Sequence, residues 1–129
     1  MTFLRELLAT PFRLRGRTVG VGLDCLGVTL ALASSRGVTD TPDPWRVVAE
    51  SWARGELPPA NGFPPGWQQV DAGAPQDDDV ALFTDKMSGA FVGVGYVLGG
   101  HIFTASASTG VYRAPAGRFT IAQLWRESA

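Results

Sequence analysis

The chain has 129 residues, of which 45% are hydrophobic and 18% are charged. This length suits one domain and is too short for two ordinary ones, and the apolar fraction argues against disorder. The net charge of −1 argues against nucleic acid as a partner, because nucleic-acid-binding domains usually carry a basic excess. A single cysteine excludes an internal disulfide, and a single histidine argues against a protein zinc site. We therefore expect one domain over residues 1–129 that holds no metal and no other cofactor.

No segment of the sequence predicts membrane insertion or export. The longest apolar stretch runs from Leu26 to Ala33, well short of the ~20 residues that span a bilayer. The first ten residues lack the basic head and apolar run of a signal peptide. We expect a chain that is made in the cytoplasm and that acts outside the cell only if something else carries it there.

The first part of the chain predicts helices. Residues 3–9 carry apolar residues at helical spacing, and residues 12–23 are rich in Gly and Arg and predict a loop. Asp24 is expected to cap a second helix over residues 25–35, with Gly37 as its stop. Because this second helix is apolar on most sides, we expect it to be buried in the middle of the fold.

A third helix is expected to begin at Asp43 and Pro44 and to end at Gly55. Its apolar face predicts packing in a core or an interface rather than stacking on a sugar, and is formed by Trp45, Val48, Ala49 and Trp52. Residues 56–66 contain four prolines and two glycines and predict an extended loop.

The second half of the chain shows the alternation and turn residues that are typical of strands. We expect strands in four segments, residues 79–84, 90–98, 101–107 and 111–113. Residues 119–126 fit either a strand or a helix. Helices followed by consecutive strands predict an α+β domain in which N-terminal helices pack on an antiparallel β-meander.

Cys25 is the residue with the clearest chemical potential. It falls at the first turn of the second predicted helix, where backbone N–H groups and the helix dipole favour a thiolate. The alternative is that a lone cysteine is a small buried hydrophobic residue without chemistry. Its position alone favours a packing residue over a nucleophile.

Five short segments stand out by their order along the chain. They are Thr10-Pro-Phe12, Asp24-Cys-Leu-Gly27, Asp79-Val-Ala-Leu-Phe83, Phe91-Val-Gly-Val94 and Ile102-Phe-Thr-Ala-Ser106. In this order and spacing, over roughly residues 3–113, the chain resembles the NlpC-type cell-wall cysteine peptidases. That family has Thr-Pro-Tyr, then Asp-Cys-x-Gly on a helix, then strands with Gly-Asp-Val-x-x-Phe, His-Val-Gly-Ile and Phe-Ile-His-Ala.

The resemblance implies a papain-like fold and an enzyme that cuts peptidoglycan stem peptides with Cys25 as its nucleophile. A chain of this size without a signal peptide is similar to members encoded in phage tail and gene-transfer-agent clusters. This similarity implies other tail-tip or baseplate proteins as partners, peptidoglycan as a further one, and assembly into a virion or a virion-like tail.

Three catalytic positions of that family hold other residue types here. Phe91 stands where the family has the His that acts as base, and the polar group that orients this His falls at Thr104. The family's Tyr hydroxyl near the oxyanion falls at Phe12, which carries no hydroxyl. Because a papain-like thiol needs a base beside it, the pattern predicts a retained fold with impaired catalysis.

His101, the single histidine, is not expected to replace the missing base. With Gly99 and Gly100 as a two-residue turn, Leu98 faces His101 at the tip of a hairpin. Phe91 lies further back along the strand, and at ~3.3 Å per residue the two positions are about 23 Å apart. A general base must come within ~3 Å of the proton that it takes, or act through one water.

The remaining polar groups are expected to have structural roles. The run Asp77-Asp78-Asp79 predicts a solvated turn rather than a calcium site, which needs more oxygen ligands from a shaped loop. Ser106 and Ser108 are expected near the Phe91 region, but hydroxyls are poor bases at neutral pH. A solvated, loop-stabilising cluster is expected from Arg13, Arg15 and Arg17.

Three functions fit these residues. The first is a structural tail-tip component with a peptidase fold that has lost its catalytic positions, and we place it first. The second is an active peptidoglycan endopeptidase that uses an unrecognised base or one supplied by a partner chain. The third is a redox-sensing thiol protein, which has Cys25 in its favour but no resolving cysteine.

Overall fold

The computed structural model describes residues 2–38, 45–59 and 61–128. They form helices and a largely antiparallel sheet, which confirms the α+β class. The helices are α1 (Phe3–Leu8), α2 (Cys25–Ser35), α3 (Arg46–Arg54) and the short 3₁₀ helix η2 (Ala116–Arg118). The strands are β1 (Arg17–Thr18), β2 (Gly22–Leu23), β3 (Trp67–Val70), β4 (Val80–Thr84), β5 (Phe91–Leu98), β6 (His101–Ser106), β7 (Gly110–Pro115) and β8 (Ile121–Glu127). The predicted helix start at Asp43 and Pro44 lies outside the described residues.

Six of the strands form one antiparallel sheet in the order β3-β8-β4-β5-β6-β7. The predicted meander is confirmed for β4 to β7, which follow one another along the chain and in the sheet. The segment that fitted a strand or a helix is strand β8, which lies between β3 and β4. The sequence does not predict β3, because its four residues are too few to show an alternating pattern.

The predicted loop before α2 contains a small hairpin. β1 and β2 have two residues each and pair antiparallel, and Phe12 adds a parallel bridge to Leu23. Strands of this length leave no periodicity in the sequence, which is why a loop is expected there. The hairpin holds the arginine-rich segment directly before the first turn of α2.

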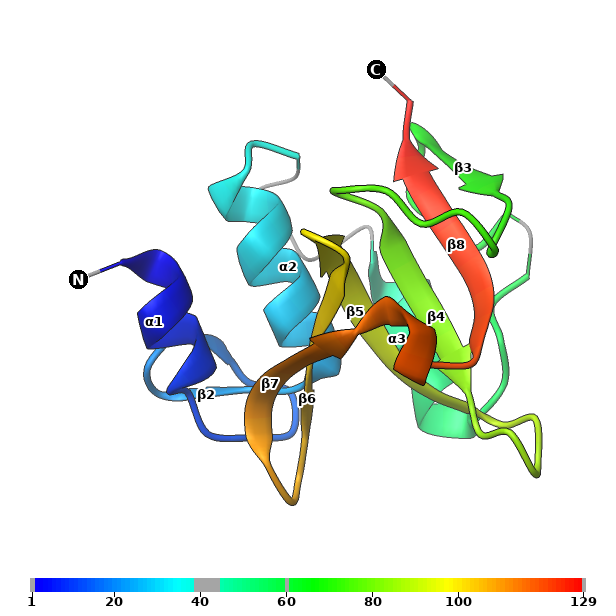
Figure 1. The fold of residues 1–129 in the computed structure, drawn as a ribbon. Helices are drawn as coiled ribbons and strands as arrows, with labels where there is room; N and C mark the ends of the chain where they lie inside the picture. Colours follow the sequence, from blue (N-terminus) through cyan, green and yellow to red (C-terminus); the bar gives the residue numbers. More distant parts are fainter. Residues whose placement is uncertain (1, 39–44, 60, 129) are drawn as a thin grey trace.

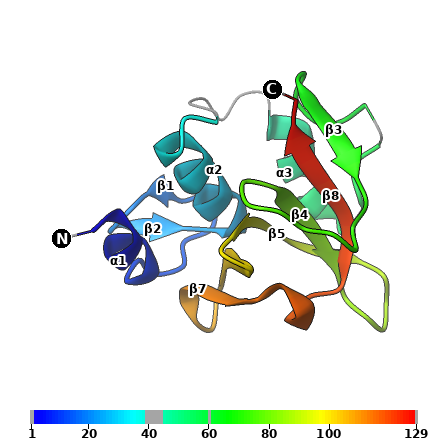
Figure 2. The same cartoon turned by 45° about the horizontal axis from the view of Figure 1, so that its top comes forward.

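Figures 1 and 2 show α1, α2 and the β1–β2 hairpin on one side of the molecule and the six-stranded sheet on the other. α2 packs on β5 and β6, α3 packs on β5, and α1 contacts β7. The larger apolar core includes residues of α2, α3 and the sheet, and a smaller core contains Phe83, Ile102 and Leu124. Seven of the eleven residues of α2 are buried, so the predicted burial is confirmed for most of the helix, although it lies on one side of the molecule rather than in its middle.

Helices α2 and α3 end at the glycines that the sequence indicates. Gly37 has a φ of 74°, and the N–H of Val38 donates to the carbonyl of Ala33 over 2.8 Å. Gly55 has a φ of 72°, in the left-handed region that glycine adopts without steric cost. The carbonyl of Gly55 accepts a hydrogen bond from the N–H of Phe91 (2.8 Å), which ties the end of α3 to the start of β5.

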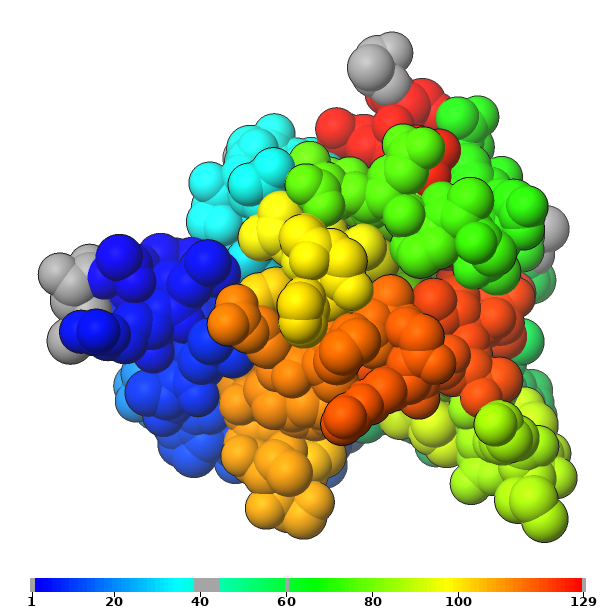
Figure 3. Space-filling model, in the orientation of Figure 1, coloured from blue at the N-terminus to red at the C-terminus, as the bar shows by residue number. Residues whose placement is uncertain are grey.

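The hairpin between β5 and β6 has the predicted two-residue turn. Gly99 and Gly100 both have positive φ, 61° and 77°, and Leu98 pairs with His101. Figure 3 shows the β4–β5 turn and the β6–β7 turn projecting separately from one edge of the molecule. His101 therefore lies at the opposite end of β5 from Phe91.

Candidate functional site

α2 begins beside a buried carboxylate whose two oxygens are both hydrogen-bonded. Asp24 is 1% exposed, and its Oδ1 accepts from the N–H of Gly27 (2.8 Å) and from the Arg17 guanidinium (2.8 Å). Its Oδ2 accepts from the backbone N–H of Arg15 (2.9 Å). The predicted helix cap is confirmed, and the same carboxylate anchors the preceding loop to the start of α2.

Cys25 occupies the first position of α2 and is 2% exposed. Burial raises the pKa of its thiol from 9.0 to about 12, and the charge of Asp24 also raises it. Hydrogen bonds from the backbone of Val94, Leu26 and Cys25 itself lower this pKa by less. The prediction that the helix start favours a thiolate is therefore wrong, because desolvation outweighs the backbone amides. At neutral pH the sulfur is a protonated thiol in an apolar environment.

A bulge in β5 turns Phe91 into the core that contains Cys25. Phe83 pairs with Gly93 but Thr84 pairs with Phe91, so Val92 is an extra residue in the strand. Val92 is 47% exposed, whereas Phe91 is 2% exposed and belongs to the same apolar core as Cys25. The position at which the resemblance implies a base is thus filled by a buried benzyl group.

The other two family positions have structural contacts. Thr104 is 1% exposed, and its hydroxyl donates to the carbonyl of Val94 over 2.8 Å. Phe12 is half-buried and bridges Leu23 in the loop before α2.

Tyr112 is a residue near the thiol that the sequence does not reveal. It pairs with Thr104 across β6 and β7, and burial raises the pKa of its phenol, with a further rise from Cys25. The register of these two strands follows from the length of their turn, which no residue pattern indicates. Asp24 and Tyr112 are the ionisable groups that interact electrostatically with Cys25 in the described part of the chain.

The polar residues of the two hairpin turns make side-chain contacts within their own turns. Nδ1 of His101 lies 3.1 Å from the carbonyl oxygen of Gly99, within its own turn. The hydroxyl of Ser106 contacts those of Ser108 (3.3 Å) and Thr109 (2.6 Å) in the β6–β7 turn.

The acidic run before β4 is not the solvated turn that the sequence predicts. Asp79 is fully buried and accepts two hydrogen bonds from Arg126, 2.7 and 2.8 Å long. Asp78 pairs with Arg36 and accepts from the hydroxyl of Tyr96 (2.8 Å). The insertion of β8 beside β4 brings Arg126 to Asp79, a proximity that the chain order hides. Within the described ranges, no three His, Cys, Asp or Glu side chains are grouped to hold a metal ion.

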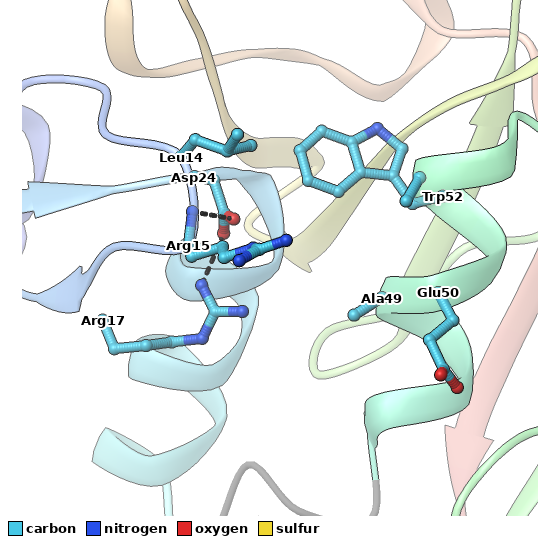
Figure 4. A pocket seen from close by; sticks show the side chains of 8 residues that line it. Leu14, Arg15, Arg17, Asp24, Ala49, Glu50 and Trp52 are labelled. Atoms are coloured by element: carbon cyan, nitrogen blue, oxygen red, sulfur yellow. Dashed lines mark hydrogen bonds and ion pairs between the residues drawn. The ribbon is translucent and has the colours of Figure 1, made fainter.

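A pocket of about 520 Å³ lies beside the start of α2, between the arginine-rich loop and α3 (Figure 4). The indole N–H of Trp52 donates to the carbonyl of Val92 over 3.1 Å and so fixes the ring over this pocket. Figure 4 shows Leu14 facing the Trp52 ring, while Arg15 extends from the loop. The full lining consists of Leu14, Arg15, Arg17, Asp24, Ala49, Glu50, Trp52 and Ala53. The sequence places Trp52 on the apolar face of its helix but does not indicate the pocket.

A comparison with protein-family models found no match, and a search among curated proteins also found none. No helix in the described ranges combines the length and the apolar character that a bilayer crossing requires. The geometry around Cys25 and the pocket beside it are therefore the observations from which a function follows.

Proposed function

We propose that this chain is a structural component of a phage-like tail tip that keeps an NlpC-type, papain-like fold without peptidase activity. The observation that carries the loss of activity is the burial of Cys25 in an apolar core that also contains Phe91. A thiol with a pKa of about 12 is ionised to only about one part in 10⁵ at pH 7. Since the thiolate is the nucleophile, such a sulfur does not attack a peptide bond at a useful rate.

The contacts of the Asp24-Cys-Leu-Gly27 segment support a fold that is retained without catalytic activity. Asp24 caps α2, Cys25 fills the core, and a Cβ on Gly27 would overlap the carbonyl oxygen of Gly16. Each residue of the motif that the resemblance rests on therefore has a packing role that needs no catalysis. Assembly into a tail with other tail-tip or baseplate proteins is supported by the resemblance of the sequence segments.

The second candidate function is an active endopeptidase that cuts peptidoglycan stem peptides. The observation in its favour is the place of Cys25 at a helix start, where backbone amides lower the pKa of the thiol against the effect of burial. This function requires a base from a partner chain and a movement that admits water to the sulfur.

Two measurements separate the candidates. The first is alkylation of Cys25 by iodoacetamide at about pH 6, where an activated thiolate reacts and an ordinary thiol does not. We expect the folded protein to react more slowly than a short unstructured cysteine peptide at the same pH. The second is the release of stem-peptide fragments from purified peptidoglycan, with Cys25→Ala as the control. We expect no difference between the two proteins, and release that depends on Cys25 would establish the peptidase instead.

A further inference from the structure

We infer that the pocket between the arginine-rich loop and α3 binds the C-terminal residue of a protein partner. The partner's terminal carboxylate lies at Arg15, and its apolar side chain lies between Leu14 and Trp52. This inference rests on the non-catalytic assembly role proposed above and gives that role a contact surface of defined chemistry.

The two arginines of the pocket differ in their contacts. Arg17 is committed, because its guanidinium donates to Asp24 and to the carbonyl of Gly16. Arg15 has no ion-pair partner among the residues that the structure describes. Its backbone is held in the left-handed region at a φ of 62°, with its N–H bonded to Asp24. Figure 4 shows the Arg15 side chain extending from the loop at this pocket, and a guanidinium binds a carboxylate through two parallel hydrogen bonds.

Leu14 and Trp52 form an apolar pair in the same pocket as Arg15. Leu14 is 63% exposed, which is unusual for a side chain that faces an indole ring. The Trp52 ring is already fixed by its hydrogen bond to Val92, so little side-chain freedom is lost when a ligand packs on it. An exposed apolar side chain opposite a fixed aromatic ring offers a place for one aliphatic side chain.

The charges of the pocket decide which ligand fits. Asp24 and Arg17 neutralise each other, which leaves Arg15 on the loop and Glu50 on α3. Glu50 points away from Arg15 and Trp52 and repels any ligand that carries several acidic groups (Figure 4). One carboxylate next to one apolar side chain is the chemistry of a single C-terminal residue, and polyanions such as nucleic acid are disfavoured.

The test uses three small probes and NMR spectra of the ¹⁵N-labelled full chain. N-acetyl-leucine carries the carboxylate and the side chain, N-acetyl-leucinamide lacks the charge, and N-acetyl-glycine lacks the side chain. We expect shifts at the Leu14 to Arg17 amides and at the Trp52 indole. We expect N-acetyl-leucine to bind about fivefold more tightly than its amide, as for an exposed ion pair.

Substitutions on the same loop provide matched controls. Arg15→Gln is expected to abolish the preference for the acid over the amide, whereas Arg13→Gln, outside the pocket lining, leaves it unchanged. Leu14→Ser is expected to weaken N-acetyl-leucine and to leave N-acetyl-glycine unaffected. The inference is overturned if N-acetyl-leucine gives no saturable shift, if acid and amide bind equally, or if Arg15→Gln binds like the unaltered chain. These outcomes are independent of the alkylation and peptidoglycan measurements. The proposal of binding in the pocket and the proposal of a non-catalytic role can therefore be rejected separately.

Discussion

The contacts of single residues explain why the pKa of the Cys25 thiol is raised. Cys25 has the helix-start amides that would stabilise a thiolate, but it lies in a core from which water is excluded. Asp24, the neighbouring carboxylate, accepts three hydrogen bonds that tie the preceding loop to the first turn of α2. The proposed loss of activity then requires that no basic group lies beside the sulfur, and the resemblance implies that such a group would stand at Phe91.

Replacing Phe91 tests this explanation directly. In Phe91→His an imidazole enters the core of the thiol, where it can accept the proton and pair with the thiolate. We expect the rate of Cys25 alkylation at pH 7 to rise by about tenfold or more over the unaltered chain. Phe91→Leu is the control, because it loosens the packing without adding a base. Mass spectrometry of the intact protein measures the alkylation. Equal rates for the His and Leu variants would contradict the explanation.

The buried ion pair of Asp79 is expected to matter for stability. Asp79→Ala leaves Arg126 and the N–H of Gln76 without their acceptor. The Arg126 side chain is 31% exposed and can be hydrated after the change, so the loss comes mainly from the N–H of Gln76 and the broken hydrogen bonds, and we expect the free energy of unfolding to fall by about 1 to 2 kcal/mol. The measurement is urea denaturation, with Asp71→Ala as control because Asp71 is exposed and caps only its own turn. A change at Asp79 no larger than that at Asp71 would show that the pair is not stabilising.

Among the elements, α2 depends on the close approach of the loop that precedes it. Gly27 faces the carbonyl oxygen of Gly16, and Asp24 bonds the loop from the same turn of the helix. Two opposing effects therefore meet at Gly27, where alanine has the better helix propensity but no room for its methyl group.

Gly27→Ala is expected to destabilise the protein although the same change stabilises an exposed helix by about 1 kcal/mol. The added Cβ overlaps backbone rather than a flexible side chain, and overpacking of this kind costs about 2 kcal/mol. Gly117→Ala is the control, since its Cβ would enter open space, and we expect a change within about 0.5 kcal/mol. Thermal denaturation of both variants measures the difference. A melting temperature of Gly27→Ala above that of the unaltered chain would show that the loop moves to make room for the methyl group.

Local signals in the sequence predict the elements that local residues control. Asp24, Gly37 and Gly55 mark helix ends through their own side chains or their own φ, and Gly99 with Gly100 marks a turn. The bulge at Val92, the β6–β7 register and the place of β8 depend on pairing between distant segments. For this reason the sequence indicates Cys25 but not the partners of Asp79, nor Tyr112, nor the pocket at Trp52.

At the scale of the whole molecule, a buried thiol and a buried phenol make the protein less stable at alkaline pH. Cys25 and Tyr96 are protonated in the folded state, because burial raises the pKa of each and Asp78 raises that of Tyr96 further. In the unfolded chain both groups ionise at lower pH. The contribution of Cys25 to stability is therefore complete below pH 9.0 and is lost as the pH rises toward 12, and that of Tyr96 is lost at still more alkaline pH. At acid pH the sign reverses for Asp78, whose pKa is lowered by Arg36, so that stability falls on its protonation.

The pH dependence gives a prediction for Cys25 alone. Between pH 9.0 and about 12, the free energy of unfolding is expected to fall by about 1 kcal/mol per pH unit through this thiol. Cys25→Ala shifts stability at every pH but removes this part of the slope. Urea unfolding of both proteins over the alkaline range measures the difference, and parallel curves would show that Cys25 is not buried as described.

The interior position of β8 has a consequence for synthesis on the ribosome. Until residues 121–127 leave the exit tunnel, β4 and β3 each present an unpaired edge, and Asp79 has no guanidinium beside it. Such an edge is a template for pairing with other nascent chains. The sheet can close only after translation of β8, so polypeptides released early are expected to aggregate or to require a chaperone.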